Sequence, residues 1–305
     1  MMGYTNRHFR FLYSLFFPNA ILFTEMIPVD YVINNMGGQK LGLGAEVYPP
    51  VCQLGGNNPK KFAIAAKAIE DLGFREININ CGCPSSKVSE GAFGVVLMND
   101  PGKVAQCVRA IRNSSNLKVS IKCRTGIDDN DEFGFLYQFV ETIEKEGLDS
   151  VTVHARKALL NGISPKDNRK IPPLNYDYPF RLQEAFKGLP VIINGGINRI
   201  DQVRLFEGKV AGVMFGRLAY QDPYELYQIS QSYQPYVLSR HAIKQEILLY
   251  LESEIKSGQA LQGIIRHLLN FKKNHPNSRK WRYDLSVCQT IDEALMLIDE
   301  MLLLF

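Results

Sequence analysis

The stretch NPKKFAIAAKAIEDLGFREININCGCP, residues 58–84, contains one helix-to-strand unit of the fold. Its first half has apolar residues at helical spacing and ends at Gly73, a residue suited to a helix C-terminus. The run Glu76 to Asn80 has the length of a buried strand, and Gly82 and Pro84 follow it closely. A helix that leads directly into an apolar strand is typical of a parallel sheet covered by helices.

The same alternation of strands and helices continues along the chain to about residue 235. We expect strands at Ala20–Thr24, Val47–Leu54, Glu76–Asn80, Lys118–Lys122, Ser150–His154, Val191–Asn194 and Gly212–Phe215. This rhythm predicts an α/β fold, a (β/α)8 TIM barrel. Because the pattern supplies seven strands, we expect the first barrel strand to be missing, lying before Met1; an open seven-stranded sheet is the alternative.

A second domain is predicted after the barrel, because only helical periodicity follows residue 236. The expected helices are His241–Lys256, Leu261–Phe271 and Ile291–Leu304. We therefore divide the chain into a catalytic barrel domain, 1–236, and an all-helical domain, 237–305.

Composition excludes several classes of protein. The 305 residues are 46% hydrophobic and 22% charged with a net charge of +4, which is typical of a folded globular protein and not of a disordered one. Six scattered cysteines in a chain of this size favour a reduced, intracellular protein over a disulfide scaffold. The apolar run from Phe9 to Phe23 is interrupted by Pro18 and Asn19, so we expect neither a signal peptide nor a membrane span.

Polar residues follow most of the predicted strands, at the end where TIM barrels carry their active sites. Among them are Gln53, Asn80, Lys122, His154, the run Asn194-Gly195-Gly196 and the pair Gly216-Arg217. The last two groups predict a phosphate site, because glycines let backbone N–H groups approach an anion and an arginine adds a charge. A cation such as Lys122 would also stabilise a reduced, anionic flavin. A core histidine is the alternative for His154.

Cys83 is the candidate acid, because a thiol is mostly protonated at neutral pH and can donate its proton. Cys81 and Cys83 form a C-x-C pair, for which metal binding is the competing interpretation. We expect no metal, because no second Cys or His pair stands at ligand spacing. Strand alternation points the two thiols to opposite sides, so Cys81 is expected to be a small buried residue.

These motifs resemble the dihydrouridine synthase family. The resemblance is carried by Asn80-Cys81-Gly82-Cys83-Pro84-Ser85, by Lys87 and by Gly91-Ala92-Phe93-Gly94. Three further runs, residues 154–158, 162–169 and 171–174, resemble the A subfamily of that family. This subfamily modifies D-loop positions 20 and 20a of tRNA. The resemblance to the family extends over nearly the whole chain.

The resemblance implies an FMN-binding barrel that uses NADPH and reduces uridine in tRNA to dihydrouridine. Cys83 resembles the acid that protonates C5 of uracil, while C6 receives hydride from FMN. Residues that match cofactor-binding positions are Met1, Met2, Gln53, Lys122, His154, Asn194, Gly195, Gly196, Gly216 and Arg217. Residues that match tRNA-binding positions are Asn80, Lys87, Lys166, Arg169, Arg279 and Arg282.

The segment from Arg266 to Arg282 supports an RNA partner, because it holds six Lys or Arg and no Asp or Glu. Trp281 lies in its basic end and either stacks on RNA or packs in the core. A cytoplasmic monomer, without membrane or metal, is expected.

Family members begin with a strand that ends in a Pro-Met-Met-like segment. Met1-Met2 resemble the last two residues of that segment, and the strand and the proline before them are missing from this sequence. Three explanations stay open for the missing strand: a mis-assigned start, a cut chain or an inactive protein. The alternative functions are a free-pyrimidine flavin oxidoreductase of the dihydroorotate dehydrogenase type and a tRNA-binding homologue with impaired catalysis.

Overall fold

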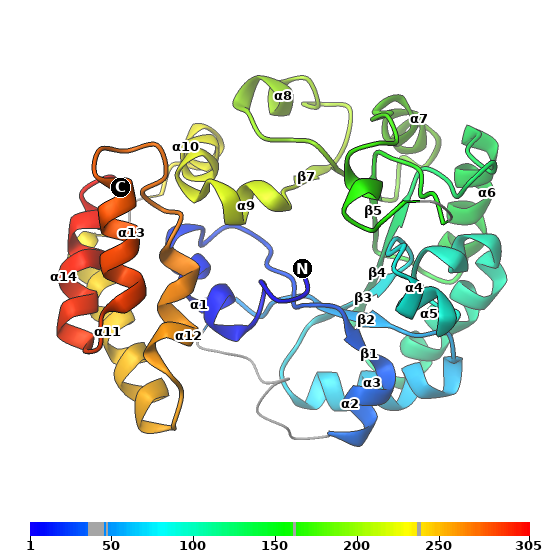
Figure 1. The fold of residues 1–305 in the computed structure, drawn as a ribbon. Coiled ribbons are helices and arrows are strands. Elements are labelled where there is room, and N and C mark those ends of the chain that lie inside the picture. The colour runs from blue at the N-terminus through cyan, green and yellow to red at the C-terminus, as the bar shows by residue number, and fades with distance from the viewer. Residues whose placement is uncertain (36–45, 47, 161–162, 237–238) are drawn as a thin grey trace. The chain divides into compact units, whose positions relative to one another are not determined.

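The computed structural model describes residues 1–35, 46, 48–160, 163–236 and 239–305 (Figure 1). The chain forms two compact units. The first comprises Met1, Phe23–Leu43 and Pro49–Gly216, and the second comprises Met2–Leu22, Gly44–Tyr48 and Arg217–Phe305. The boundary at 236/237 stays a prediction. No described helix is both long and apolar enough to cross a membrane.

The first unit contains a parallel sheet of seven strands whose spatial order follows the sequence. The strands are β1 (Ile27–Pro28), β2 (Cys52–Gly55), β3 (Glu76–Asn80), β4 (Lys118–Arg124), β5 (Ser150–His154), β6 (Val191–Asn194) and β7 (Gly212–Met214). Each strand is hydrogen-bonded in parallel to the next; in the described part of the chain β1 and β7 have one neighbour each. The fold is therefore of the α/β barrel type, as the sequence pattern predicts.

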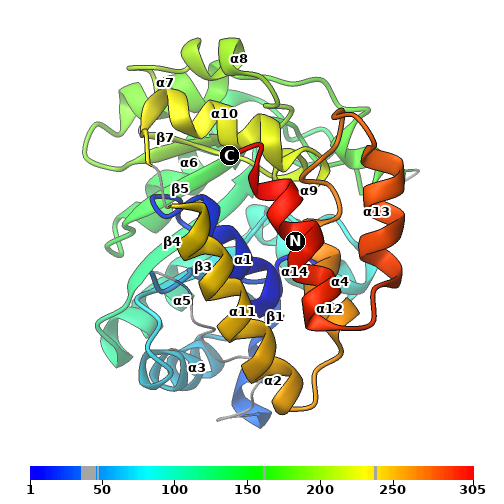
Figure 2. The ribbon, with the colours of Figure 1, turned by 90° about the vertical axis from the view of Figure 1, so that its left-hand side faces the viewer.

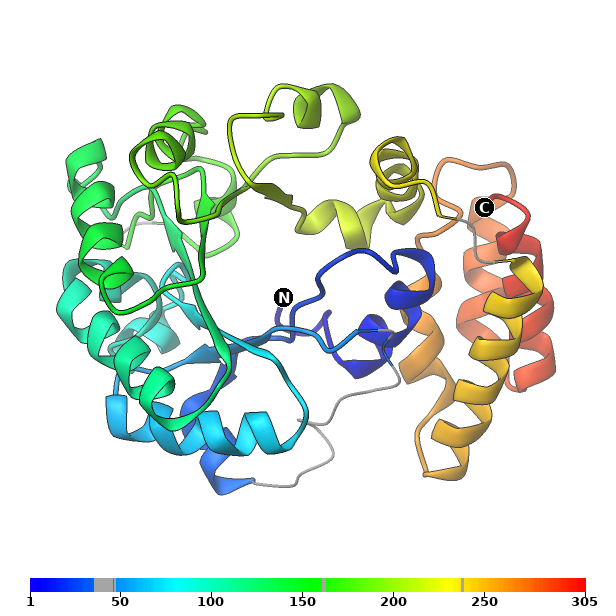
Figure 3. The same cartoon turned by 180° about the vertical axis from the view of Figure 1, so that it is seen from behind.

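Helices connect the strands and cover the outer side of the sheet (Figures 1 and 3). The helices of this unit are α2 (Val29–Asn34), α3 (Pro59–Asp71), α4 (Ser86–Glu90), α5 (Pro101–Ser114), α6 (Phe133–Glu144), α7 (Asp177–Ala185) and α8 (Ile200–Arg204). Short 3-10 helices, η1 (Gly94–Asn99) and η2 (Asp167–Arg169), lie in the loops that follow β3 and β5.

Local sequence explains where α3 begins and ends. The Asn58 side chain accepts hydrogen bonds from the N–H groups of Lys60 and Lys61, at 3.0 and 3.3 Å, and Pro59 occupies the first helical position. Gly73 follows the helix with φ +89°, a conformation that L side chains rarely adopt.

The two sides of the sheet differ in polarity. On β3 the buried Ile77 and Ile79 belong to the apolar core shared with the covering helices. Asn78 and Asn80 alternate with them and so lie on the opposite side. The Asn78 amide nitrogen donates to Ser120 Oγ on β4 at 3.0 Å. The inner side of the sheet is therefore polar near β3 and β4, as a binding site for a polar ligand requires.

Two of the predicted strands were placed wrongly. Among the described residues the Ala20–Thr24 run contributes a single bridge, Phe23 to Val51, and Ile21 is 74% exposed. The edge strand of the described sheet is instead Ile27–Pro28, and edge strands are where prolines in sheets are found. In the run Val47–Leu54, Val47 lies outside the described residues, and β2 begins only at Cys52 because Pro49 and Pro50 cannot donate hydrogen bonds.

The second unit is helical (Figure 2). It contains α1 (Arg7–Phe16), α9 (Arg217–Gln221), α10 (Pro223–Tyr233), α11 (Arg240–Lys256), α12 (Leu261–Ile265), η3 (Arg266–Leu268), α13 (Ser278–Val287) and α14 (Ile291–Leu302). The predicted helix Leu261–Phe271 is thus split, and α10 and α13 were not foreseen. α14 starts with a capping box between Thr290 and Glu293 and packs against α11 and α13.

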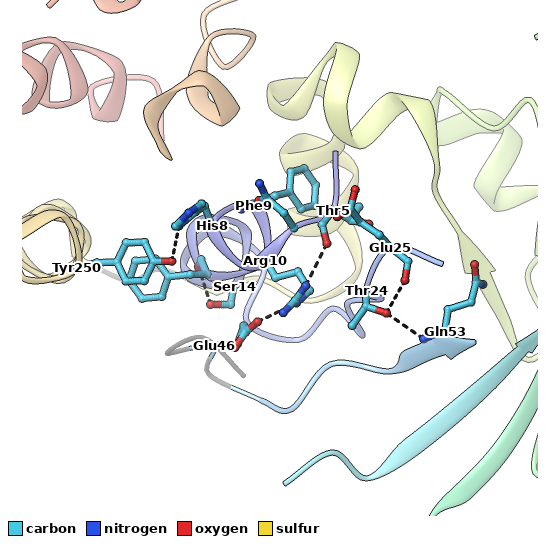
Figure 4. Close-up of polar contacts among 12 residues, drawn as sticks. Thr5, His8, Phe9, Arg10, Ser14, Thr24, Glu25, Glu46, Gln53 and Tyr250 are labelled. Atoms are coloured by element: carbon cyan, nitrogen blue, oxygen red, sulfur yellow. Dashed lines mark hydrogen bonds and ion pairs between the residues drawn. The ribbon is translucent and has the colours of Figure 1, made fainter. Parts of the chain in front are cut away.

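Polar contacts tie the N-terminal helix into the second unit (Figure 4). A His8 ring nitrogen and the Tyr250 hydroxyl are 2.8 Å apart. Arg10 donates to Glu46 at 2.8 Å and to the Thr5 carbonyl at 3.1 Å. Burial, with the charge of Arg7 as the next cause, lowers the pKa of His8 to about 4, so that this histidine is neutral at physiological pH.

Candidate active site

The structure brings most of the predicted site residues together at the carboxyl ends of neighbouring strands. Asn80 on β3 is in register with Lys122 on β4, and His154 on β5 is in register with Asn194 on β6. Gln53 on β2 joins them, because the Asn80 amide nitrogen donates to its Oε1 at 2.9 Å. The Gln53 N–H in turn donates to the Thr24 hydroxyl at 2.9 Å (Figure 4).

Cys83 lies on a tight loop held by Asn80. The side-chain oxygen of Asn80 accepts hydrogen bonds from the N–H groups of Gly82 and Cys83, at 3.1 and 3.0 Å. The Cys83 carbonyl accepts from Val95 at 3.0 Å, and a Cβ on Gly94, which has φ +73°, would come within 2.7 Å of that carbonyl. The backbone is therefore fixed on both sides of the thiol.

The two cysteines of the C-x-C pair differ in environment. Cys81 is completely buried, as predicted, and burial raises the pKa of its thiol well above the ordinary value. Cys83 is half-buried, so that a ligand can reach it. Among the described residues no three His, Cys, Asp or Glu side chains are grouped as metal ligands.

Lys122 supplies a cation to the same group of strand ends. Its side chain is half-buried, and its ammonium group forms no hydrogen bond or ion pair within the described part of the chain. Burial, followed by the positive charge of Arg124, lowers its pKa to about 8. Such a cation lacks an internal counter-charge, and an anionic or electron-rich ligand would stabilise it.

The Gly195-Gly196 turn approaches His154 closely. Both glycines have positive φ, +116° and +70°, and a Cβ on Gly195 would come within 2.5 Å of the imidazole Cδ2 of His154. A Cβ on Gly196 would come within 2.6 Å of Leu174 Cδ1. Glycine is therefore required at both positions, and the turn presents bare backbone beside the histidine.

The other residues of the predicted phosphate site lie at the ends of β6 and β7 and at the start of α9. The Asn194 amide nitrogen donates to the Met214 carbonyl on β7 at 2.8 Å. A Cβ on Gly216 would meet nothing within 4 Å. Arg217 begins α9 and belongs to the second unit, as does Met2. Met1 belongs to the first unit, and both methionines are exposed. The cofactor roles of all these residues, like those of Gln53, Lys122, His154, Gly195 and Gly196, stay predictions.

Arg124 was missed as a site residue, although it ends the strand that carries Lys122. Its buried guanidinium donates from Nε to the Gly82 carbonyl at 2.9 Å and from Nη1 to the carbonyls of Lys157 and Asn168, at 3.0 and 3.1 Å. Burial, above all, lowers the pKa of Arg124 to about 10. Arg124 thus joins the Cys83 loop to the loop after β5. Its place at a strand end was the signal that could have revealed it.

The loop after β5 carries two of the predicted RNA contacts. Lys166 precedes η2 and Arg169 is its last residue; both are exposed. Asn168 between them is fully buried, and its side chain accepts from the Leu159 N–H at 2.8 Å and donates to the Leu159 carbonyl at 2.7 Å. The side chain of Lys87, on α4, lies outside what the structure describes.

The basic segment from Arg266 to Arg282 contains both paired cations and cations without a partner among the described residues. Lys272 pairs with Glu300, Lys273 with Asp222 and Lys280 with Asp284, while Arg266 donates to the Gly3 carbonyl. Arg279 and Arg282 are exposed, and neither has a hydrogen bond or ion pair within the described residues. Trp281 is buried, and its indole N–H donates to the Leu297 carbonyl at 2.8 Å. Of the two predicted roles, Trp281 therefore packs in the core and does not stack on RNA.

A flavin suits the first-unit site on physical grounds. Lys122, which has no ion-pair partner among the described residues, offers a cation for an electron-rich ring. The Gly195-Gly196 turn leaves backbone exposed where side chains would collide. Together with a reachable thiol on a fixed loop at the strand ends, these features suit a flavin-dependent oxidoreductase of the α/β barrel class.

The family model for dihydrouridine synthase matches residues 1–304, and the chain belongs to that family. A tRNA-dihydrouridine(20/20a) synthase from Vibrio cholerae is 40% identical over 290 residues, covering 94% of this chain and 88% of that protein. A protein of the same name from Haemophilus ducreyi is 38% identical over 312 residues, covering 98% and 96%.

A solved structure of 2-naphthoyl-CoA reductase in complex with 2-naphthoyl-CoA is similar with a TM-score of 0.56 at 10% identity. The match covers 75% of this chain, which spans 47% of that protein. This likeness shows the fold alone.

Proposed function

We propose that this protein reduces uridine to 5,6-dihydrouridine in the D-loop of tRNA, at positions 20 and 20a. The observation that supports it best is the half-buried Cys83 thiol, held on a loop by Asn80 beside the strand end that carries Lys122. An acid and a cofactor cation on neighbouring strands suit the addition of a proton and a hydride to one double bond.

Each residue of the site has a task in the proposed reaction. Bound FMN, with NADPH as the source of its electrons, supplies the hydride that C6 of uracil receives. Cys83 gives its Sγ proton to C5, and solvent then returns a proton to the thiolate. Arg124 and Asn80 keep the backbone of the Cys83 loop in place through the carbonyl and N–H groups of Gly82.

We assign the cofactor to the barrel domain, for which the proposed bounds are 1–236. Lys122 would face the electron-rich edge of the isoalloxazine ring. Gln53 and His154 would orient the ring, and Asn194, Gly195, Gly196, Gly216 and Arg217 would hold the phosphate. Met1 and Met2 are proposed to touch the flavin with their backbone.

The target uridine must leave the RNA stack to reach Cys83, so the protein needs contacts on either side of the flipped base. We assign Asn80, Lys87, Lys166 and Arg169 to the RNA near the flipped base, and Arg279 and Arg282 in the helical domain, 237–305, to phosphates farther away. The relatives named for positions 20 and 20a support that choice of substrate. We further propose a monomer that works in the cytoplasm.

The visible absorption spectrum of the purified chain tests this function. We expect flavin bands that NADPH bleaches and that tRNA lacking dihydrouridine restores, because reoxidation requires an acceptor that takes both hydride and proton. Free uridine serves as the control: reoxidation by uridine alone would favour a free-pyrimidine oxidoreductase. A colourless protein that takes up no added FMN but still binds tRNA would instead favour a homologue with impaired catalysis.

Arg279 and Arg282 should contribute to tRNA affinity through phosphate contacts. The double variant R279A/R282A is expected to weaken tRNA binding and to reduce the slope of log K against log salt by roughly one for each lost contact. K280A is the matched control, since the Lys280 ammonium is occupied by Asp284 at 2.6 Å. Equal binding by all three proteins, measured between low and moderate salt, would contradict this role.

A further inference from the structure

We infer that Tyr283 completes a binding site for an unpaired nucleotide on the outer face of α13, with its ring stacking on the base. Arg279 and Arg282 supply the cations for the flanking phosphates. This inference rests on the proposed function and deepens it, because it names the part of the RNA that the helical unit contacts.

The geometry of α13 places these three side chains on one face. Tyr283 stands four residues after Arg279 and directly after Arg282, so that Arg279 has both as neighbours at i+4 and i+3. Trp281 and Leu285 lie on the other face, where both are buried. The hydrogen bond from Trp281 to the Leu297 carbonyl fixes the rotation of the helix. The outer face is therefore presented as a rigid platform.

Tyr283 is more exposed than its size would lead one to expect. Its side chain is 66% exposed, whereas Trp281, two residues earlier, is only 2% exposed. In the described structure the ring has no aromatic or cation contact, and its hydroxyl has no hydrogen bond. An aromatic surface held on a helix and left bare has a face available for a flat ligand.

The charges around the ring favour RNA over other flat ligands. Asp284, the acidic residue on this helix, is neutralised by Lys280, and no carboxylate pairs with Arg279 or Arg282 in the described part of the chain. Two uncompensated guanidiniums beside an exposed aromatic ring match the two parts of a nucleotide, phosphate and base. A base in a duplex has both faces covered, so the ring selects an unpaired nucleotide.

The salt dependence of tRNA binding separates stacking from phosphate contact. We would measure it for five proteins: the parent, Y283L, Y283F, R282A and the control Y233L. Stacking predicts that Y283L weakens binding by roughly tenfold without changing the salt slope. Y283F should bind like the parent because the ring remains. R282A should lower the slope by about one. Y233L is the control, a leucine exchange at another exposed tyrosine of the second unit.

The outcomes distinguish the inference from the function on which it rests. If the parent binds tRNA and Y283L binds equally well, the stacking site is wrong while the proposed function stands. The stacking site is also wrong if Y283L reduces the salt slope, because Tyr283 would then act through charge. It is likewise wrong if Y233L loses as much tRNA affinity as Y283L. If the parent binds no tRNA, the proposed function fails first. Circular dichroism of each variant verifies that the helices are retained.

Discussion

Replacing Cys83 with alanine should slow the reduction of uridine in tRNA by roughly 10²-fold or more, the range for a lost general acid. The hydride acceptor C6 would still be available, but the developing charge at C5 would have no positioned proton. Flavin reduction by NADPH and the affinity for tRNA should not change, because neither uses the thiol. Single-turnover reoxidation of the reduced protein by unmodified tRNA measures the affected step directly.

C81A is the matched control for this experiment. Cys81 is fully buried, two residues before Cys83, and its thiol has a raised pKa because of that burial. Its removal leaves a small cavity and should lower the melting temperature modestly, without an effect on the reoxidation rate. Normal reoxidation in C83A, or an equal loss in C81A, would show that Cys83 is not the acid.

Replacing Lys122 with methionine should weaken FMN binding by roughly tenfold or more and slow flavin reduction by NADPH. Methionine keeps most of the volume of the side chain but removes a cation that has no internal counter-charge in the described structure. The reduced, anionic flavin loses more than the oxidised form, because the cation stabilises the added charge. Fluorescence titration of the apoprotein and the flavin midpoint potential measure the two effects. An unchanged potential would contradict the assignment.

The same lysine predicts a pH dependence. Its pKa is lowered to about 8, first by burial and then by Arg124, so the free protein loses this charge as pH rises through 8. If FMN binds the ammonium form, its affinity should be constant below pH 8 and fall above it, by up to tenfold per pH unit. K122M should bind weakly at every pH and show no such fall between pH 7 and 9. A parent protein with constant affinity over that range would exclude the ammonium from the binding step.

Much of the barrel-type unit could be predicted because its signals are local. The Glu76–Asn80 strand has the predicted bounds, and its alternation correctly placed Cys81 in the core. The first strand was misplaced because an apolar run at Ala20–Thr24 resembles a buried strand, whereas the backbone partner of β2 is set by register at Ile27. The helix α13 has a mean composition too polar for its periodicity to stand out, and only packing of Trp281 and Leu285 reveals it.

By itself the sequence determined the order of strands and helices, the candidate acid Cys83 and the residues at the strand ends, because hydrophobic periodicity and strand-end chemistry depend on near neighbours in the chain. The tertiary structure decided which groups have partners. Arg124 binds carbonyls of Gly82 and Asn168, and Lys280 pairs with Asp284, whereas Arg279 and Arg282 pair with nothing described. Pairing depends on distances between residues far apart in sequence or on the rotation of a helix, and composition contains neither.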